Sequence, residues 1–157
     1  MSTTTETARP TDVSNGNWRA GVVSGIAGAF VMGLLILAMN AATLAVAIPS
    51  LYGLAPPPSV GAGLAVHLSH GAVLGVAFAG IVGALDRDDA AGVVGLGLVW
   101  GAVTWAVLAA LLMPLWLAAV GSPASPPFPN FALPSLLWHL VFGAVLGGGY
   151  AATMDRV

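Results

Sequence analysis

The stretch that decides the fold is His67-Leu-Ser-His70-Gly71-Ala-Val-Leu-Gly75-Val-Ala-Phe-Ala79. Much of it recurs as His139-Leu-Val-Phe142-Gly143-Ala-Val-Leu-Gly147-Gly-Gly-Tyr-Ala151. In each copy a histidine, two glycines and an alanine follow one another at intervals of four residues, which puts them in one row along a helix. The pattern predicts two equivalent helices, each led by a histidine and followed by a ridge of small residues.

Small residues four apart allow two helices in a membrane to approach closely, by van der Waals contact between their backbones. We therefore predict that both ridges pack against neighbouring helices. The packing residues expected from this pattern are Gly71, Gly75 and Ala79 in the first copy and Gly143, Gly147 and Ala151 in the second.

The composition excludes an ordinary soluble domain. Of the 157 residues, 58% are hydrophobic and 6% are charged, whereas a soluble surface needs several times more charge. Four arginines without any lysine cannot neutralise a run of phosphates, so we expect no nucleic-acid partner. The absence of cysteine excludes disulfides and thiolate metal sites. An integral membrane protein with the lipid bilayer as its partner fits this composition.

Four long apolar runs predict an all-α integral membrane four-helix bundle, with spans at about residues 20–48, 60–85, 90–120 and 134–154. Residues 1–18 are polar and predict a disordered tail, which leaves residues 19–157 as one transmembrane domain. The first apolar run is about twice as long as the hydrophobic region of a signal peptide, so we expect a retained helix.

The two halves of the chain follow the same plan, which predicts an internal repeat. Residues 20–85 and 90–154 each contain a long apolar helix, a proline-rich loop and a histidine-led helix. The start of each half also matches, as Ala-Gly-Val-Val at 20–23 and at 91–94. Because two spans lie between them, both copies enter the membrane from the same side. We predict parallel repeats related by a pseudo-twofold axis along the membrane normal.

The charges predict the topology. Every arginine lies in a tail or in the middle loop, and both proline-rich loops lack lysine and arginine. The positive-inside rule makes the arginine-bearing side cytoplasmic, so both termini are expected there. The use of arginine without lysine, together with abundant alanine and glycine, is typical of a GC-rich prokaryotic gene. The expected location is therefore the cell (plasma) membrane.

Three histidines are the candidate site: His67, His70 and His139. They are the only residues of the predicted spans that titrate near neutral pH, and ionisable groups inside a membrane are functional candidates. His67 and His139 begin equivalent helices, so we expect them at one depth and facing a shared space. They could ligate haem b, act as a protonatable gate or a metal-ion site in transit, or bond neighbouring carbonyls as structural residues. The sequence does not decide among these three, and the metal and cofactor stay unknown.

The sequence predicts no enzyme. No acidic residue occurs in 20–85 or 90–154, so a nucleophile–base–carboxylate set cannot form inside the membrane. We expect a small transport or channel-like protein, or an accessory membrane subunit, with the histidine pair at its centre. A b-type haem electron carrier, with His67 and His139 as axial ligands, and a purely structural membrane protein are the alternatives. Copies of the same chain or a larger membrane complex are possible partners.

The glycine-patterned segment Ala20–Gly33 and the two histidine-led ridges resemble small prokaryotic inner-membrane proteins of the YagU-like type. The resemblance covers about a third of the chain, and its motifs consist mostly of glycine and alanine. It implies a four-helix membrane protein without an assigned reaction, and it carries over no functional residue. His70 departs from the pattern, because its counterpart in the second copy is Phe142.

The topology can be tested by labelling, since the chain has no native cysteine. A cysteine introduced as Ser125→Cys, in the second proline-rich loop, should react with a membrane-impermeant maleimide in intact cells. Asp88→Cys, in the arginine-bearing middle loop, should react only after the membrane is opened. Protection of the first cysteine together with labelling of the second in intact cells would reverse the predicted orientation.

Overall fold

The computed structural model describes residues 16–156, and this part of the chain is helical and contains no strand. The elements are α1 (Trp18–Ala42), η1 (Thr43–Ala47), α2 (Ile48–Ser50), α3 (Val60–Ala84), α4 (Ala90–Thr104), η2 (Trp105–Leu112), α5 (Met113–Ala119) and α6 (Leu133–Thr153), of which η1 and η2 are π-helical. Residues 1–15 of the predicted tail lie outside the described residues. Trp18, its last residue, is the first residue of α1.

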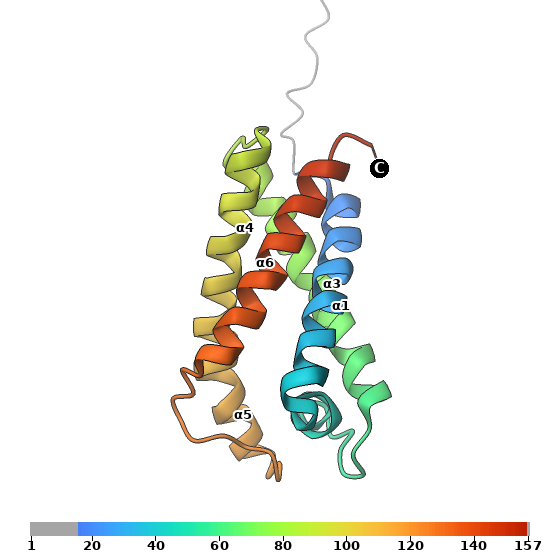
Figure 1. Cartoon of the computed structure of the whole chain (residues 1–157), viewed down its shortest axis with the longest axis vertical. Coiled ribbons are helices and arrows are strands. Elements are labelled where there is room, and N and C mark those ends of the chain that lie inside the picture. Colours follow the sequence, from blue (N-terminus) through green and yellow to red (C-terminus); the bar gives the residue numbers. More distant parts are fainter. Residues whose placement is uncertain (1–15, 157) are drawn as a thin grey trace, which may run out of the picture.

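These elements form four helical units that are long and apolar enough to cross a membrane, at Trp18–Ser50, Val60–Ala84, Ala90–Ala119 and Leu133–Thr153. The all-helical, multi-pass architecture predicted from the sequence is confirmed. The start of α1, the end of α6 and the loop between α3 and α4 lie together at one end of the bundle, called here the terminal end (Figure 1). Both proline-rich loops lie at the opposite end, called the loop end.

The first hairpin is held by a close approach of α1 and α3. A Cβ atom added to Gly21 would collide with the carbonyl oxygen of Gly75, and one added to Gly75 would collide with that of Gly21. Gly25 and Gly71 stand in the same reciprocal relation. Only glycine fits at these four positions, because each backbone packs directly on the other.

The second hairpin uses the same contact between α4 and α6. A Cβ atom at Gly97 would collide with the carbonyl oxygen of Gly143, and one at Gly143 with that of Gly97. These partners are 46 residues apart (143 − 97), as are Gly25 and Gly71 (71 − 25). The two contacts are related by an offset of 72 residues (97 − 25 and 143 − 71), which is the offset between His67 and His139, whereas the matching starts of the two halves differ by 71 (91 − 20). The repeat itself stays a prediction.

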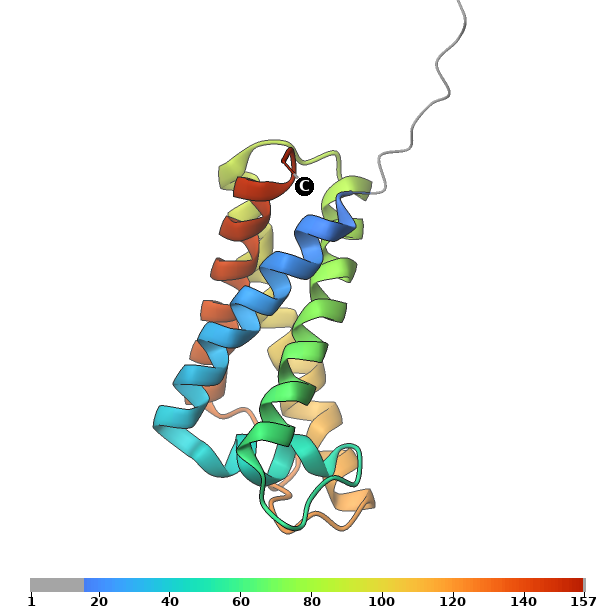
Figure 2. The same ribbon diagram turned by 90° about the vertical axis from the view of Figure 1, so that its right-hand side faces the viewer.

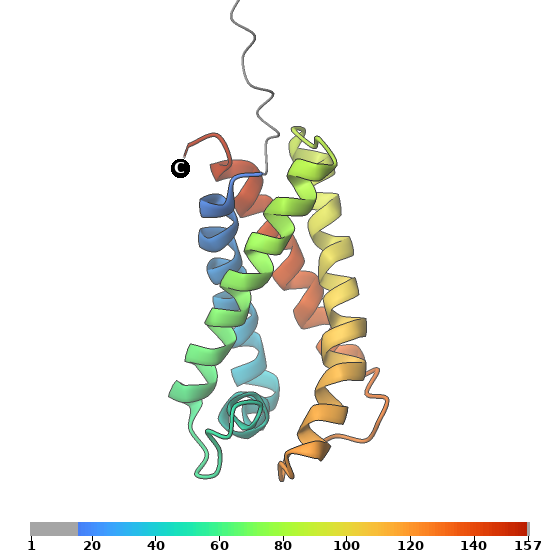
Figure 3. The same cartoon turned by 180° about the vertical axis from the view of Figure 1, so that it is seen from behind.

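The first span is not one long or tilted helix. Asn40 has non-helical backbone angles (φ −156°, ψ 73°), and the chain bends there. Beyond the bend, the segment 43–50 runs across the bundle, so that Figures 1 and 3 show it end-on and Figure 2 shows it from the side. Asparagine has a poor helix propensity, because its side chain competes for backbone groups, and this is the physical reason for a break at this position.

A proline explains the shape of the crossing segment. Pro49 cannot donate a hydrogen bond to the carbonyl of Ala45, four residues earlier. That carbonyl instead accepts the backbone N–H of Ser59, at 2.8 Å, from the end of the proline-rich loop. The helical segment therefore continues past Pro49 to Ser50.

The third span repeats this arrangement. Pro114 leaves the carbonyl of Ala110 without its helical donor, and the N–H of Asn130 in the second proline-rich loop bonds to it at 2.9 Å. The irregularity is not confined to Pro114, because the π-helical turns of η2 begin nine residues earlier, at Trp105. In a bilayer such freed carbonyls must be satisfied within the protein.

The two hairpins pack closely through α1 and α6 but not through α3 and α4. Helix α1 packs along α6, where Gly28 lies against Phe142. By contrast, α3 and α4 are adjacent at the short loop that joins them and diverge toward the loop end (Figure 3). The bundle is therefore closed at its terminal end and spread at its loop end.

The glycine contacts give a direct stability test. Gly75→Ala should destabilise the protein by about 1–3 kcal/mol, since the new methyl group meets backbone atoms that cannot move independently. Gly80→Ala, on the same helix, is the matched control, because a Cβ atom there has open space around it. Thermal unfolding in detergent measures both. Equal stability of the two variants would contradict the packing.

Candidate functional site

A cavity of about 520 Å³ lies between the two hairpins in the loop half of the bundle. It receives residues from α1, α3, η2, α5 and α6, and all three histidines line it. The side chains that line the cavity include His67, His70, Leu74, Leu112, Met113, Trp116, Ser135, Trp138, His139 and Phe142.

His67 is 8% exposed and packs over Gly33 of α1. The ring lies against α1, near the backbone of Ala29. Within residues 16–156, its Nε2 atom is buried without a hydrogen-bond partner. Such a nitrogen is available to a ligand, as an acceptor or as a donor according to the tautomer of the ring.

The tautomer of His139, on α6, is set by a hydrogen bond. Its Nδ1 lies 2.7 Å from the backbone carbonyl oxygen of Ser135, one helical turn earlier. A carbonyl oxygen only accepts, so Nδ1 carries the proton and the neutral ring presents Nε2 as an acceptor.

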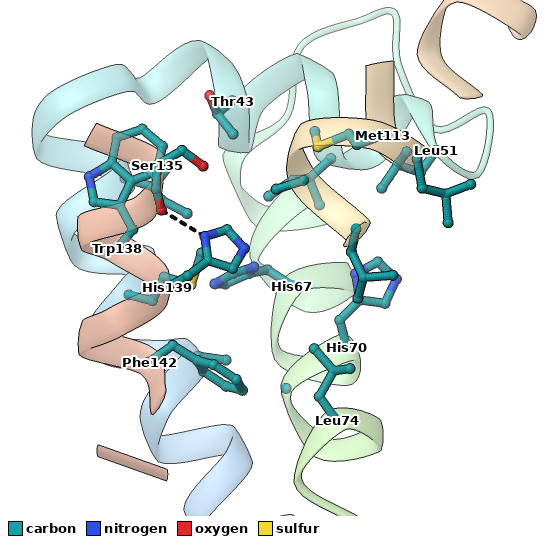
Figure 4. A pocket seen from close by; sticks show the side chains of 18 of the residues that line it. Thr43, Leu51, His67, His70, Leu74, Met113, Ser135, Trp138, His139 and Phe142 are labelled. Atoms are coloured by element: carbon teal, nitrogen blue, oxygen red, sulfur yellow. Dashed lines mark hydrogen bonds between the residues drawn. The ribbon is translucent and has the colours of Figure 1, made fainter. Parts of the chain in front are cut away.

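The rings of His67 and His139 face each other from α3 and α6 (Figure 4). They are close enough to interact electrostatically. Two imidazole rings thus lie in one cavity, and the bond from Nδ1 of His139 to Ser135 orients that ring and sets its tautomer.

His70 has a different role. Its Nε2 lies 2.8 Å from the hydroxyl of Tyr52, in the first proline-rich loop, so that nitrogen already has a partner. The ring lies apart from the other two histidines in Figure 4. The structure therefore brings two of the three predicted site residues together and places the third at the edge of the cavity.

Apart from Thr43, Tyr52 and Ser135, the rest of the lining is apolar or aromatic, and its indole donors are occupied. Trp116 donates its indole N–H to the carbonyl oxygen of Leu51 at 3.0 Å, and Trp138 donates to the sulfur of Met39 at 3.1 Å. No cluster of three or more histidine, aspartate or glutamate side chains that could hold a metal ion occurs within the described range 16–156. The site offers imidazole acceptors in an uncharged, mostly apolar space.

A second hollow, of about 490 Å³, lies at the terminal end of the bundle. It is polar, and it is lined by Asn17, Asp86, Arg87, Asp88, Tyr150 and Asp155 among others. Between the two hollows lies a fully buried layer that contains Phe78, Leu146 and Tyr150, which we call the plug. The rings of Phe78 and Tyr150 meet edge to face with centroids 5.7 Å apart.

Sequence reasoning missed the plug and the cavity wall formed by η2 and α5. Tyr150 looks like an interfacial aromatic residue in the sequence, yet it is buried and its hydroxyl accepts the N–H of Asn17 at 2.8 Å. The wall residues Leu112 and Met113 belong to a continuous apolar run, in which no polar residue marks the side that faces the cavity. The one sequence feature that could have pointed to this wall is Pro114, because a proline inside an apolar run marks an irregular backbone.

Nitrogen NMR of the histidine side chains tests the tautomer of His139. In protein labelled with ¹⁵N-histidine, His139 should show a protonated Nδ1 and an unprotonated Nε2, because the Ser135 carbonyl holds the Nδ1 proton. The signal is assigned by its loss in His139→Gln. A proton on Nε2 of this ring at neutral pH would contradict the arrangement.

Comparison of the chain with protein-family models, with curated proteins and with solved structures finds no match in any of the three. The resemblance to YagU-like proteins therefore stays an expectation from the sequence. What the protein does has to be inferred from the cavity, the two facing imidazoles and the buried plug.

Proposed function

We propose that the protein is a small transport-type membrane protein whose solute binds in the cavity at the loop end, next to His67 and His139. The carrying observation is the pair of hollows at opposite ends of the bundle, separated by the plug. Hydrophobic constrictions gate passage in membrane channels, and we assign that role to the plug. An accessory subunit would need a binding pocket but not the second hollow.

The chemistry of the cavity supports an uncharged solute. Neither half of the transmembrane domain contains a charged side chain that could balance a buried ion. The volume of about 520 Å³ falls in the range of about 300–1,000 Å³ that is usual for small-molecule sites. Two fixed imidazole nitrogens in an apolar space supply the few polar contacts that orient such a ligand.

Haem ligation is the second candidate, and the two unpartnered Nε2 atoms are the observation that favours it. Haem propionates are anionic, however, and Arg19, Arg87 and Arg156 all lie at the terminal end of the bundle, away from the cavity. An optical spectrum of the purified protein separates the two candidates. A Soret band that shifts on reduction with dithionite selects haem.

Cysteine accessibility tests passage directly. Ser135→Cys places a thiol in the cavity and keeps the backbone carbonyl that His139 uses. A transport-type protein should allow a membrane-impermeant thiol reagent to reach this cysteine from both faces, in right-side-out and in inverted vesicles. Phe78→Ala should speed labelling from the face nearer the terminal end several-fold, because it thins the plug.

Leu137→Cys is the matched control. It lies on the same helix, two residues away, but is exposed on the outside of the bundle and does not line the cavity. In lipid its thiol should stay unreactive from both faces. Labelling of Ser135→Cys from one face only would mean a binding pocket without passage, and would overturn the transport proposal.

A further inference from the structure

We infer that the ligand of the cavity is a neutral, lipid-soluble hydroxyl compound, such as a phenol or a long-chain alcohol, whose O–H donates to Nε2 of His139. This inference rests on the proposed function, since it names the class of solute for the same cavity. It is drawn from the hydrogen bond of His139, the lining, and the wall of the cavity that reaches the outside of the bundle.

His139 selects a donor. Its Nδ1–H is committed to the carbonyl of Ser135, so its Nε2 can only accept. A ligand that carries only acceptors, such as an ether or a ketone, would leave this nitrogen unsatisfied. A hydroxyl group satisfies it directly, and the unpartnered Nε2 of His67 is available to a second polar contact of the ligand.

The lining selects an apolar body. Aromatic and thioether side chains dominate it, among them Trp138, Phe142 and Met113. The wall formed by η2 and α5 reaches the outside of the bundle, since its lining residues Leu112 and Trp116 expose 53% and 50% of their surface. In a four-helix membrane protein that outer surface faces lipid. A molecule dissolved in the bilayer can therefore approach the cavity through this wall.

A metal cation fits the cavity less well. The chain has no cysteine, and the spans contain no carboxylate that could neutralise a cation in an apolar space. Two imidazoles alone leave most of the coordination positions of a divalent ion unfilled. Met113 also lines the cavity, so a soft monovalent ion such as Cu(I) is the cation to include in the test.

The test uses protection of Ser135→Cys from a thiol reagent, in full-length protein reconstituted in nanodiscs. The probes are para-nonylphenol and its methyl ether, which share ring and tail but differ in the donor. The phenol should protect the cysteine at about tenfold lower concentration than the ether. Adding His67→Leu or His139→Leu should reduce this difference severalfold, whereas Ser69→Ala, which removes a hydroxyl bonded to Ala65 outside the cavity, should leave it unchanged.

The controls separate the two proposals. Reaction of the cysteine without any probe establishes the open cavity on which the proposed function depends. If the cysteine reacts but the phenol and the ether protect equally, the ligand class is wrong while the cavity stands. The inferred ligand class is also overturned if the phenol still protects better than the ether in both histidine variants. Stronger protection by Cu(I) than by the phenol overturns it as well. Should one histidine variant fail to fold, the other variant and the wild-type comparison still decide.

Discussion

The close contact between glycine backbones is the interaction on which the rest of the structure depends. Lipid tails are as apolar as the side chains they would replace, so helices in a bilayer gain little from apolar burial and need close van der Waals contact instead. Gly25 and Gly71 supply that contact in the first hairpin, and Gly97 and Gly143 supply it in the second. Each hairpin is thus tightly packed, and the cavity lies between the two hairpins.

The irregular helical segments around the cavity contain two carbonyl groups that prolines leave without their helical donors. The carbonyls of Ala45 and Ala110 are each capped by a backbone N–H from a proline-rich loop, so the irregular segments beside them stay satisfied in an apolar environment. Irregular helical turns are frequent at functional sites, because they change the direction of side chains. Here the segment after Asn40 crosses the loop end of the bundle, and η2 forms one wall of the site.

The sequence was sufficient for the fold and only partly sufficient for the site. Apolar run lengths and the spacing of glycines are local properties, and they predicted the four helices within a few residues of their ends. The break at Asn40 was missed, because one polar residue inside a long apolar run says little about backbone angles. The bond from Tyr52 to His70 was also missed, since it joins a loop to a helix through the tertiary fold.

The same hydrogen bond explains why three histidines in similar surroundings need not share one function. His139 bonds a carbonyl through Nδ1, which leaves its Nε2 as an acceptor, and Nε2 of His67 is buried without a partner. In His70 it is Nε2 that meets the Tyr52 hydroxyl, which ties the first proline-rich loop to α3. Since Tyr52 also lines the cavity, this bond fixes the loop beside it. The Nε2 atom of His70 is therefore committed within the fold, whereas that of His67 is not.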